Sequence, residues 1–146
     1  MAKVPTRSPT DEPVPYGRLS SMGMELDEIA DDGTVALGKL VELAEDRGRP
    51  ASHYVVALPL ATELTLAKSG GTEVRICAGN CQSYGALVLI DHLVARSLAK
   101  GGITITPVEC LDRCDVPPAC ELRGPGGQLV LAPATTTNLD EALDAL

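Results

Sequence analysis

Aromatic side chains are nearly absent from this chain of 146 residues, which has three tyrosines and neither phenylalanine nor tryptophan. Basic side chains are also few, because 12 Lys and Arg stand against 20 Asp and Glu, for a formal net charge of -8. Proteins that bind nucleic acids use basic patches to neutralise phosphates and aromatic side chains to stack on bases. The composition therefore argues against a nucleic acid as a partner.

Long hydrophobic runs are missing as well. The longest apolar stretches, such as residues 54–61 and 86–90, fall far short of the roughly 18 residues that a transmembrane helix needs. The start of the sequence, MAKVPTRSPT, lacks the apolar stretch of a signal peptide. Hydrophobic residues make up 45% and charged residues 22%, a balance typical of a globular domain with one core. We expect a cytoplasmic protein without direct membrane insertion.

Residues suited to catalysis are scarce. The two histidines, His53 and His92, are not adjacent to any cysteine, whereas a Rieske centre needs two histidine ligands. No glycine-rich G-x-G-x-x-G motif follows a predicted strand, so this chain is not expected to bind NAD. No side chain stands out as a general acid or base. We therefore expect no catalysis by the isolated chain.

The first part of the chain divides into a tail and a helical region. Residues 1–24 hold four prolines with several Ser and Thr, which predicts a flexible or extended tail that orders on a partner. Residues 25–50 form the helical region, in which Asp31 or Asp32 caps a helix that runs to about Asp46. The following segment, 51–68, is ambiguous because its apolar residues show no clear alternation.

From residue 72 the pattern predicts a strand, a helix and a second strand. Residues 73–76 alternate between polar and apolar and lead to Cys77, and residues 103–108 alternate again and lead to Cys110. Residues 82–100, between them, carry apolar side chains at steps of three and four, which is typical of a helix. A crossover of this length favours parallel strands. Both cysteines would then lie at the carboxyl edge of the sheet, where α/β ligand sites usually are.

A hairpin and a final helix complete the predicted α/β domain, which spans residues 51–146. The sequence Gly-Pro-Gly-Gly at 124–127 is a strong turn signal between a strand that begins at Leu122 and a return strand over 128–131. Asn138 predicts the start of the last helix, over 139–146.

Cysteine is the residue type with the most informative spacing. All five cysteines lie in the second half of the chain, and four of them form two C-x3-C pairs: Cys77 with Cys81 and Cys110 with Cys114. In a reducing cytosol an odd set of this kind is typical of metal binding or catalysis. Four thiolates suit Zn²⁺ or an iron–sulfur cluster. Structural zinc sites usually have C-x2-C pairs, so the wider spacing favours a two-iron cluster.

Other interpretations of the cysteines remain open. A zinc ion could stabilise an accessory module that bridges subunits. A dithiol oxidoreductase would need C-x-x-C at a helix start, and the pair Cys77 and Cys81 has one residue too many. The fifth cysteine, Cys120, could be a buried core thiol, a substitute ligand or a neighbour of the cluster.

Residues 50–146 resemble the thioredoxin-like [2Fe-2S] ferredoxins. This family includes the 24-kDa-type subunit of respiratory complex I and the gamma or E-type small subunits of NAD-dependent formate dehydrogenases and NAD-reducing hydrogenases. The resemblance is carried by His53-Tyr54 about twenty residues before the first cysteine, and by the strand Val74-Arg-Ile-Cys77. Its other parts are Cys81 followed by Gly85-Ala86 at a helix start, and the string E-C-L-x-x-C-x-x-x-P from Glu109 to Pro118, which is the most specific.

The resemblance implies a thioredoxin-like sheet with flanking helices and one [2Fe-2S] cluster. The family's ligands fall here on Cys77, Cys81, Cys110 and Cys114. The implied function is that of an electron-transfer subunit. Its partners would be the larger NADH- and FMN-binding and iron–sulfur subunits of an oxidoreductase complex. The alternatives are a stand-alone ferredoxin of the same fold and the zinc-stabilised adaptor.

Overall fold

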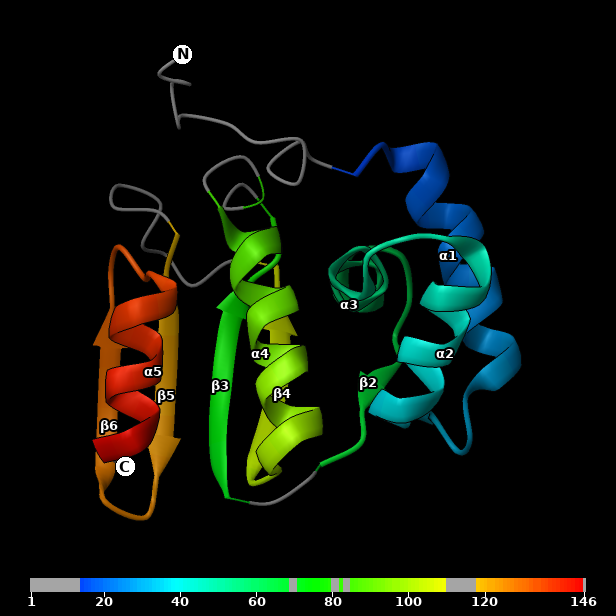
Figure 1. The fold of residues 1–146 in the computed structure, drawn as a ribbon. Helices are drawn as coiled ribbons and strands as arrows, with labels where there is room; N and C mark the ends of the chain where they lie inside the picture. The colour runs from blue at the N-terminus through cyan, green and yellow to red at the C-terminus, as the bar shows by residue number, and fades with distance from the viewer. Residues whose placement is uncertain (1–13, 69–70, 80–81, 83–84, 110–117, 146) are drawn as a thin grey trace.

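The computed structural model describes residues 14–68, 71–79, 82, 85–109 and 118–145 (Figure 1). They form a mixed α/β structure, as the sequence predicted. In chain order the elements are α1 (Tyr16–Ile29), β1 (Thr34–Val35), α2 (Leu37–Arg47), α3 (Ala51–Ala61), β2 (Thr65–Leu66), β3 (Thr72–Cys77), α4 (Ala86–Lys100), β4 (Ile103–Val108), β5 (Cys120–Gly124), β6 (Gly127–Leu131) and α5 (Thr136–Ala145).

The main sheet has the strand order β4-β3-β5-β6. Strands β3 and β4 are parallel, with Thr72 opposite Ile103 and Cys77 opposite Val108, and α4 makes the crossover between them. Strand β5 is antiparallel to β3 and forms the predicted hairpin with β6. The parallel pair and the hairpin are confirmed. The carboxyl ends of β3 and β4 therefore lie at the same edge of the sheet as the start of β5.

Two helices cover one face of this sheet. Figure 1 shows α4 and α5 side by side in front of the strands, and Arg96 of α4 binds Asp140 and Asp144 of α5 at 2.8 and 2.6 Å. Helix α4 buries Leu87, Ile90 and Leu93 in the core, at the helical spacing that the sequence showed. The expected start of this helix at residue 82 is wrong, because Gly85 has φ of 101° and α4 begins after it.

The N-terminal helices pack together beside this sheet. Helix α3 is their centre and contacts α1, α2, α4 and β4. The side chains of residues 55–58 are all fully buried, so α3 is apolar on every side. This is why the segment gave no periodic signal in the sequence. Helix α1 lies close to α3 at Gly23, where an added Cβ would be 3.1 Å from Cγ2 of Thr62.

Helix α1 runs across the expected boundary between tail and helical region at residue 24. Its buried side chains, Leu19, Met22 and Leu26, recur at steps of three and four. All the prolines of the expected tail precede the helix, and Pro15 immediately precedes its first residue. A proline before the first turn is compatible with a helix because no backbone N–H is lost from its interior. Residues 16–24 are thus helical, and residues 1–13 are not among those described.

Two predicted helix caps are placed differently by the structure. Asp31 and Asp32 do not cap α2, which begins at Leu37, because Asp32 has φ of 54° and Asp31 joins a turn closed by hydrogen bonds with Thr34. That turn leads into β1, which pairs in parallel with β2. At the other end, α5 begins at Thr136 and Asn138 is its third residue. The N–H of Asn138 donates to Oγ1 of Thr135 at 3.0 Å, so Thr135 is the cap.

Among the described residues, no helix is both long enough and apolar enough to cross a membrane.

Candidate metal centre

Cys77 is the last residue of β3 and is almost fully buried, with 1% of its surface exposed. Its backbone N–H donates to the carbonyl of Ala119 at 3.4 Å, just before β5. Its Sγ lies 3.5 Å from the carbonyl oxygen of Glu109, just after β4. The sheet thus brings the ends of β3 and β4 and the start of β5 together at Cys77.

Helix α4 begins beside Cys77. The two side chains that form a small buried cluster of their own are Cys77 and Ala86, the first residue of the helix. The N-terminus of a helix carries partial positive charge on its free N–H groups. The location of Cys77 at the amino end of α4 therefore suits a thiolate and a group of negative charge.

The segment between Cys77 and Cys81 is in direct contact with the end of β4, just before Cys110. Ala78, after the first cysteine, donates its backbone N–H to the carbonyl of Val108 at 2.6 Å. The next residue, Gly79, lies so near Glu109 that a Cβ would be 2.5 Å from the Glu109 carbonyl oxygen. In the sequence, Gly79 precedes Cys81 by two positions and Glu109 precedes Cys110 by one. Parallel pairing of β3 and β4 is what joins these segments, which are far apart in the chain.

Cys77 is the one predicted ligand among the described residues. The predicted ligands Cys81, Cys110 and Cys114 lie outside them, so the structure does not show how the four thiols are arranged. Within the described ranges, no group of three or more His, Cys, Asp or Glu side chains could hold a metal ion.

Gln82 is a buried polar residue that sequence reasoning did not single out. Only 4% of its surface is exposed. Its Oε1 accepts a hydrogen bond of 2.9 Å from the backbone N–H of Val14, and its Nε2 donates to the carbonyl of Ala78. Its own N–H donates to the carbonyl of Gly79 at 3.1 Å. The one signal in the sequence was its place immediately after Cys81.

Cys120 is the first residue of β5 and is completely buried. Burial, with a smaller contribution from the nearby Cys77, raises the pKa of the Cys120 thiol to about 12. A thiol in these surroundings keeps its proton at neutral pH and resembles a small apolar side chain. Among the interpretations open for Cys120, these surroundings favour a core thiol.

The two histidines lie in other parts of the structure. Nε2 of His92, on α4, is 2.9 Å from Oδ1 of Asp140 on α5, so His92 belongs to the hydrogen-bonded contacts between these helices. His53, on α3, is partly buried, and burial lowers its pKa. Its neighbour Tyr54 is fully buried, and the Tyr54 hydroxyl donates to Glu25 at 2.7 Å and accepts from Arg49 at 3.0 Å. These contacts give Tyr54 a role in joining α3 to α1.

A hollow of about 520 Å³ lies beside the edge strand β4. Residues 104–107 form one wall, and the end of α3 with the segment up to Lys68 forms the other. The lining is mostly apolar and contains neither cysteine nor histidine. Its chemistry does not suit a transition metal.

No known protein-family model matches this chain, and no curated protein sequence does.

Proposed function

We propose that the chain is an electron-transfer subunit that carries one [2Fe-2S] cluster on Cys77, Cys81, Cys110 and Cys114. It would relay single electrons to or from an NADH- and flavin-containing partner in a multi-subunit oxidoreductase. The observation that carries this proposal is the contact of Cys77 and Gly79 with Glu109. That contact joins the segments that precede the second cysteine of one pair and the first cysteine of the other.

The strand topology supports the proposed fold family. A β-α-β unit with parallel strands, followed by an antiparallel hairpin and a helix, is the arrangement shared by thioredoxin-like domains. The elements from β3 to α5 follow this order, with β3 and β5 in the middle of the sheet. Residues 51–146 are thus proposed to be a thioredoxin-like ferredoxin domain.

The residues around Cys77 fit such a cluster. Four thiolates are the usual ligands of a two-iron cluster, which takes up and returns one electron at a time. Cys77, Ala78 and Ala86 are at most 1% exposed and would keep water from one side of it. The amino end of α4 would stabilise the negative charge that four thiolates bring. The chain itself would hold the cluster and exclude solvent without performing bond chemistry.

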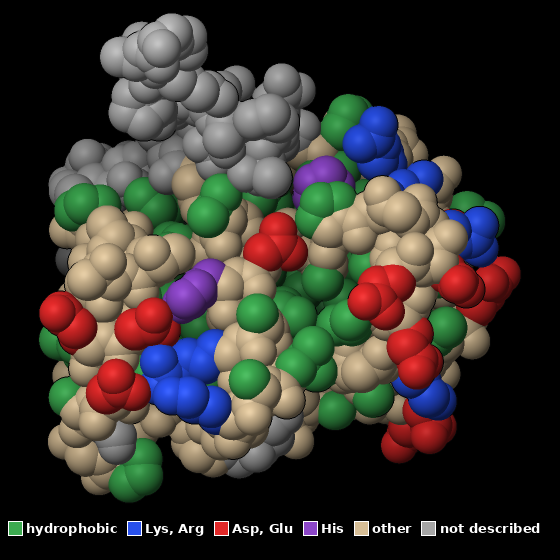
Figure 2. Space-filling model, in the orientation of Figure 1, with side chains coloured by type: hydrophobic (Ala, Val, Ile, Leu, Met, Phe, Trp, Pro, Cys, Tyr) green, Lys and Arg blue, Asp and Glu red, His purple; other side chains and the backbone are tan. Residues whose placement is uncertain are grey.

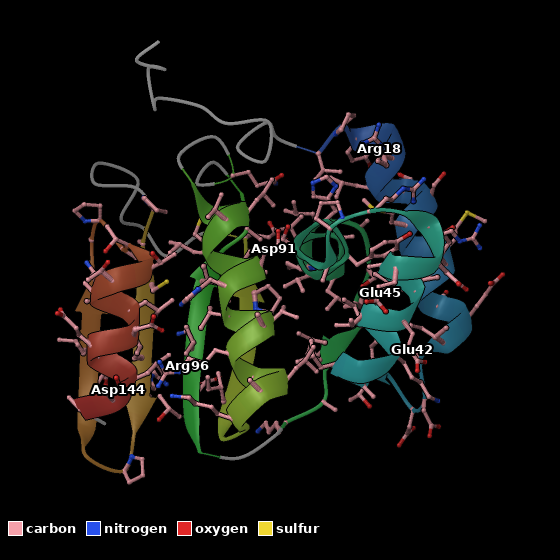
Figure 3. The ribbon with its side chains drawn as sticks, in the orientation of Figure 1. Arg18, Glu42, Glu45, Asp91, Arg96 and Asp144 are labelled. Carbon is pink, nitrogen blue, oxygen red and sulfur yellow. The ribbon has the colours of Figure 1, made fainter. Side chains whose placement is uncertain are left out.

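The surface charge fits a partner with a basic docking face. Figure 2 shows acidic side chains interspersed with basic ones over the N-terminal helices, and the exposed Glu42 and Glu45 are labelled on α2 in Figure 3. The net charge of -8 makes the whole chain acidic, and an acidic protein is attracted to a basic partner surface. We therefore propose docking to the larger NADH- and FMN-binding and iron–sulfur subunits of a cytoplasmic complex.

Metal and sulfide analysis of anaerobically purified protein tests the proposal. We expect visible charge-transfer absorption and about two irons and two sulfides per chain. The variant Cys77→Ala should lose the cluster, and the matched variant Cys120→Ala should retain it, because Cys120 is a core thiol in this proposal. A colourless protein with one zinc would contradict electron transfer and support the adaptor alternative. A clustered protein that copurifies with no partner would support the stand-alone ferredoxin.

A further inference from the structure

The hydrogen bonds of Gln82 join the N-terminal segment to the loop after Cys77. We propose that Gln82 is a positioning residue for the cluster loop and that the Val14 backbone N–H is the group that holds it in place. The effect of Gln82 on a cluster rests on the proposed function, whereas its hydrogen bonds to Val14 and Ala78 do not. It makes the segment before α1 a component of the cluster-binding unit, although 68 positions separate residues 14 and 82.

The orientation of the Gln82 amide follows from its two partners. The oxygen faces a backbone donor, Val14 N–H, and the nitrogen faces a backbone acceptor, Ala78 C=O, at 2.6 Å. The reverse orientation would place donor against donor and acceptor against acceptor. Because the site is buried, an amide or N–H left unpaired there would have no water to replace the lost hydrogen bond. Both bonds are therefore expected to be maintained together.

These bonds hold the described residues that flank Cys81 in the sequence, which are Ala78 and Gly79 on one side and Gln82 on the other. Ala78 is held to β4 by its N–H and to Gln82 by its carbonyl. Gln82 is held to Gly79 by its own N–H and to Val14 by its side chain. Cys81 is the residue between these fixed points that would bind iron. Restricting the backbone on both sides of a ligand reduces the entropy that is lost when metal binds.

The chain offers a matched pair of variants for the Val14 N–H. Val14→Pro removes the donor, and because residue 14 precedes Pro15 its backbone prefers the extended region, which proline adopts. Val14→Ala keeps the N–H and removes more of the side chain. On the other side of the bond, Gln82→Met keeps the length of the side chain and removes both hydrogen bonds. The double variant of Val14→Pro with Gln82→Met closes the cycle.

The test is the rate at which a chelator removes iron from the full-length, cluster-loaded chain. We expect Val14→Pro and Gln82→Met each to release iron about tenfold faster than the wild type, with the double variant no faster than the faster single variant. Val14→Ala should release iron at close to the wild-type rate. The EPR spectrum of the reduced cluster should shift in the two hydrogen-bond variants, which a change in overall stability alone would not cause. Wild-type rates and spectra in both single variants, or effects that multiply in the double variant, would overturn the proposal.

A second measurement separates failure of the positioning role from failure of the proposed function. If the wild-type chain binds no iron, electron transfer is wrong, and the contact is then tested by amide hydrogen exchange of the metal-free protein. We expect faster exchange in the segment 76–89 for Val14→Pro and wild-type exchange for Val14→Ala. Equal exchange in the two variants would mean that the Val14 N–H does not hold the loop.

Discussion

Gly79 and Glu109 touch through their backbones, and a Cβ on residue 79 would stand 2.5 Å from the carbonyl oxygen of Glu109. Real Cβ atoms do not approach a carbonyl this closely, so one of the two segments would have to move. We therefore predict that Gly79→Ala weakens or abolishes cluster binding, measured as iron and sulfide per chain. Gly17→Ala is the matched control, because its Cβ would meet nothing within 4 Å on α1. Equal cluster contents in the two variants would contradict the predicted effect.

Asp91 of α4 caps helix α3 from outside that helix, and Figure 3 shows it between the two helices. Its carboxylate accepts hydrogen bonds of 2.9 Å from both the N–H and the hydroxyl of Ser52, which is fully buried. We predict that Asp91→Ala lowers the free energy of unfolding by about 1–2 kcal/mol, measured by urea denaturation. Asp91→Asn, which retains one acceptor, should lose less. A loss of the same size in both variants would mean that capping is not the cause.

Asp140 gives a prediction about pH. Hydrogen bonds from His92, and then from Arg96, hold the pKa of Asp140 below its ordinary value of 3.8. A carboxyl group with a lowered folded-state pKa stabilises the fold above its unfolded pKa and loses that effect as pH falls through the folded pKa. The difference in unfolding free energy between wild type and Asp140→Asn should thus be present at pH 6 and shrink below about pH 4. A difference that grows on acidification would contradict this assignment.

Cys120 should be unreactive in the folded protein. A thiol that is fully buried and has a pKa raised to about 12 is almost entirely protonated at pH 8, and the thiolate is the reactive form. We predict that iodoacetamide at pH 8 leaves Cys120 unmodified in the native chain and modifies it after unfolding, as measured by mass spectrometry of peptides. Rapid modification of native protein at this position would show that the start of β5 opens to solvent.

The part of the fold that could be predicted is the part with local signals. Alternation in residues 73–76 and 103–108, and the glycine-rich turn at 124–127, depend on neighbours in the chain, and β3, β4 and the hairpin lie where these signals indicated. The N-terminal elements could not be predicted in this way. Helix α3 is buried on all sides and therefore has no polar stripe, and β1 and β2 have two residues each and exist because they pair with one another.

In the candidate site, too, the features with a local sequence signal could be predicted and those that depend on a distant partner could not. The placement of Cys77 at the end of a strand followed from the alternation before it. The buried hydrogen bond of Gln82 with Val14 could not be predicted, because Val14 lies far away in the sequence and contributes a backbone group that any residue except proline would supply. Periodicity alone put the start of α4 too early, at residue 82, whereas the resemblance put Gly85-Ala86 at a helix start, and α4 does begin at Ala86.

The parallel pairing of β3 with β4 also sets an order of assembly. The contact between Cys77 and Glu109 joins residues 32 positions apart, so it cannot form until α4 and β4 have been synthesised. During synthesis, the first cysteine pair emerges well before its counterpart and has no preformed pocket. Under the proposed function, iron–sulfur insertion would therefore follow pairing of β3 with β4, and a chain interrupted within α4 would be unable to receive a cluster.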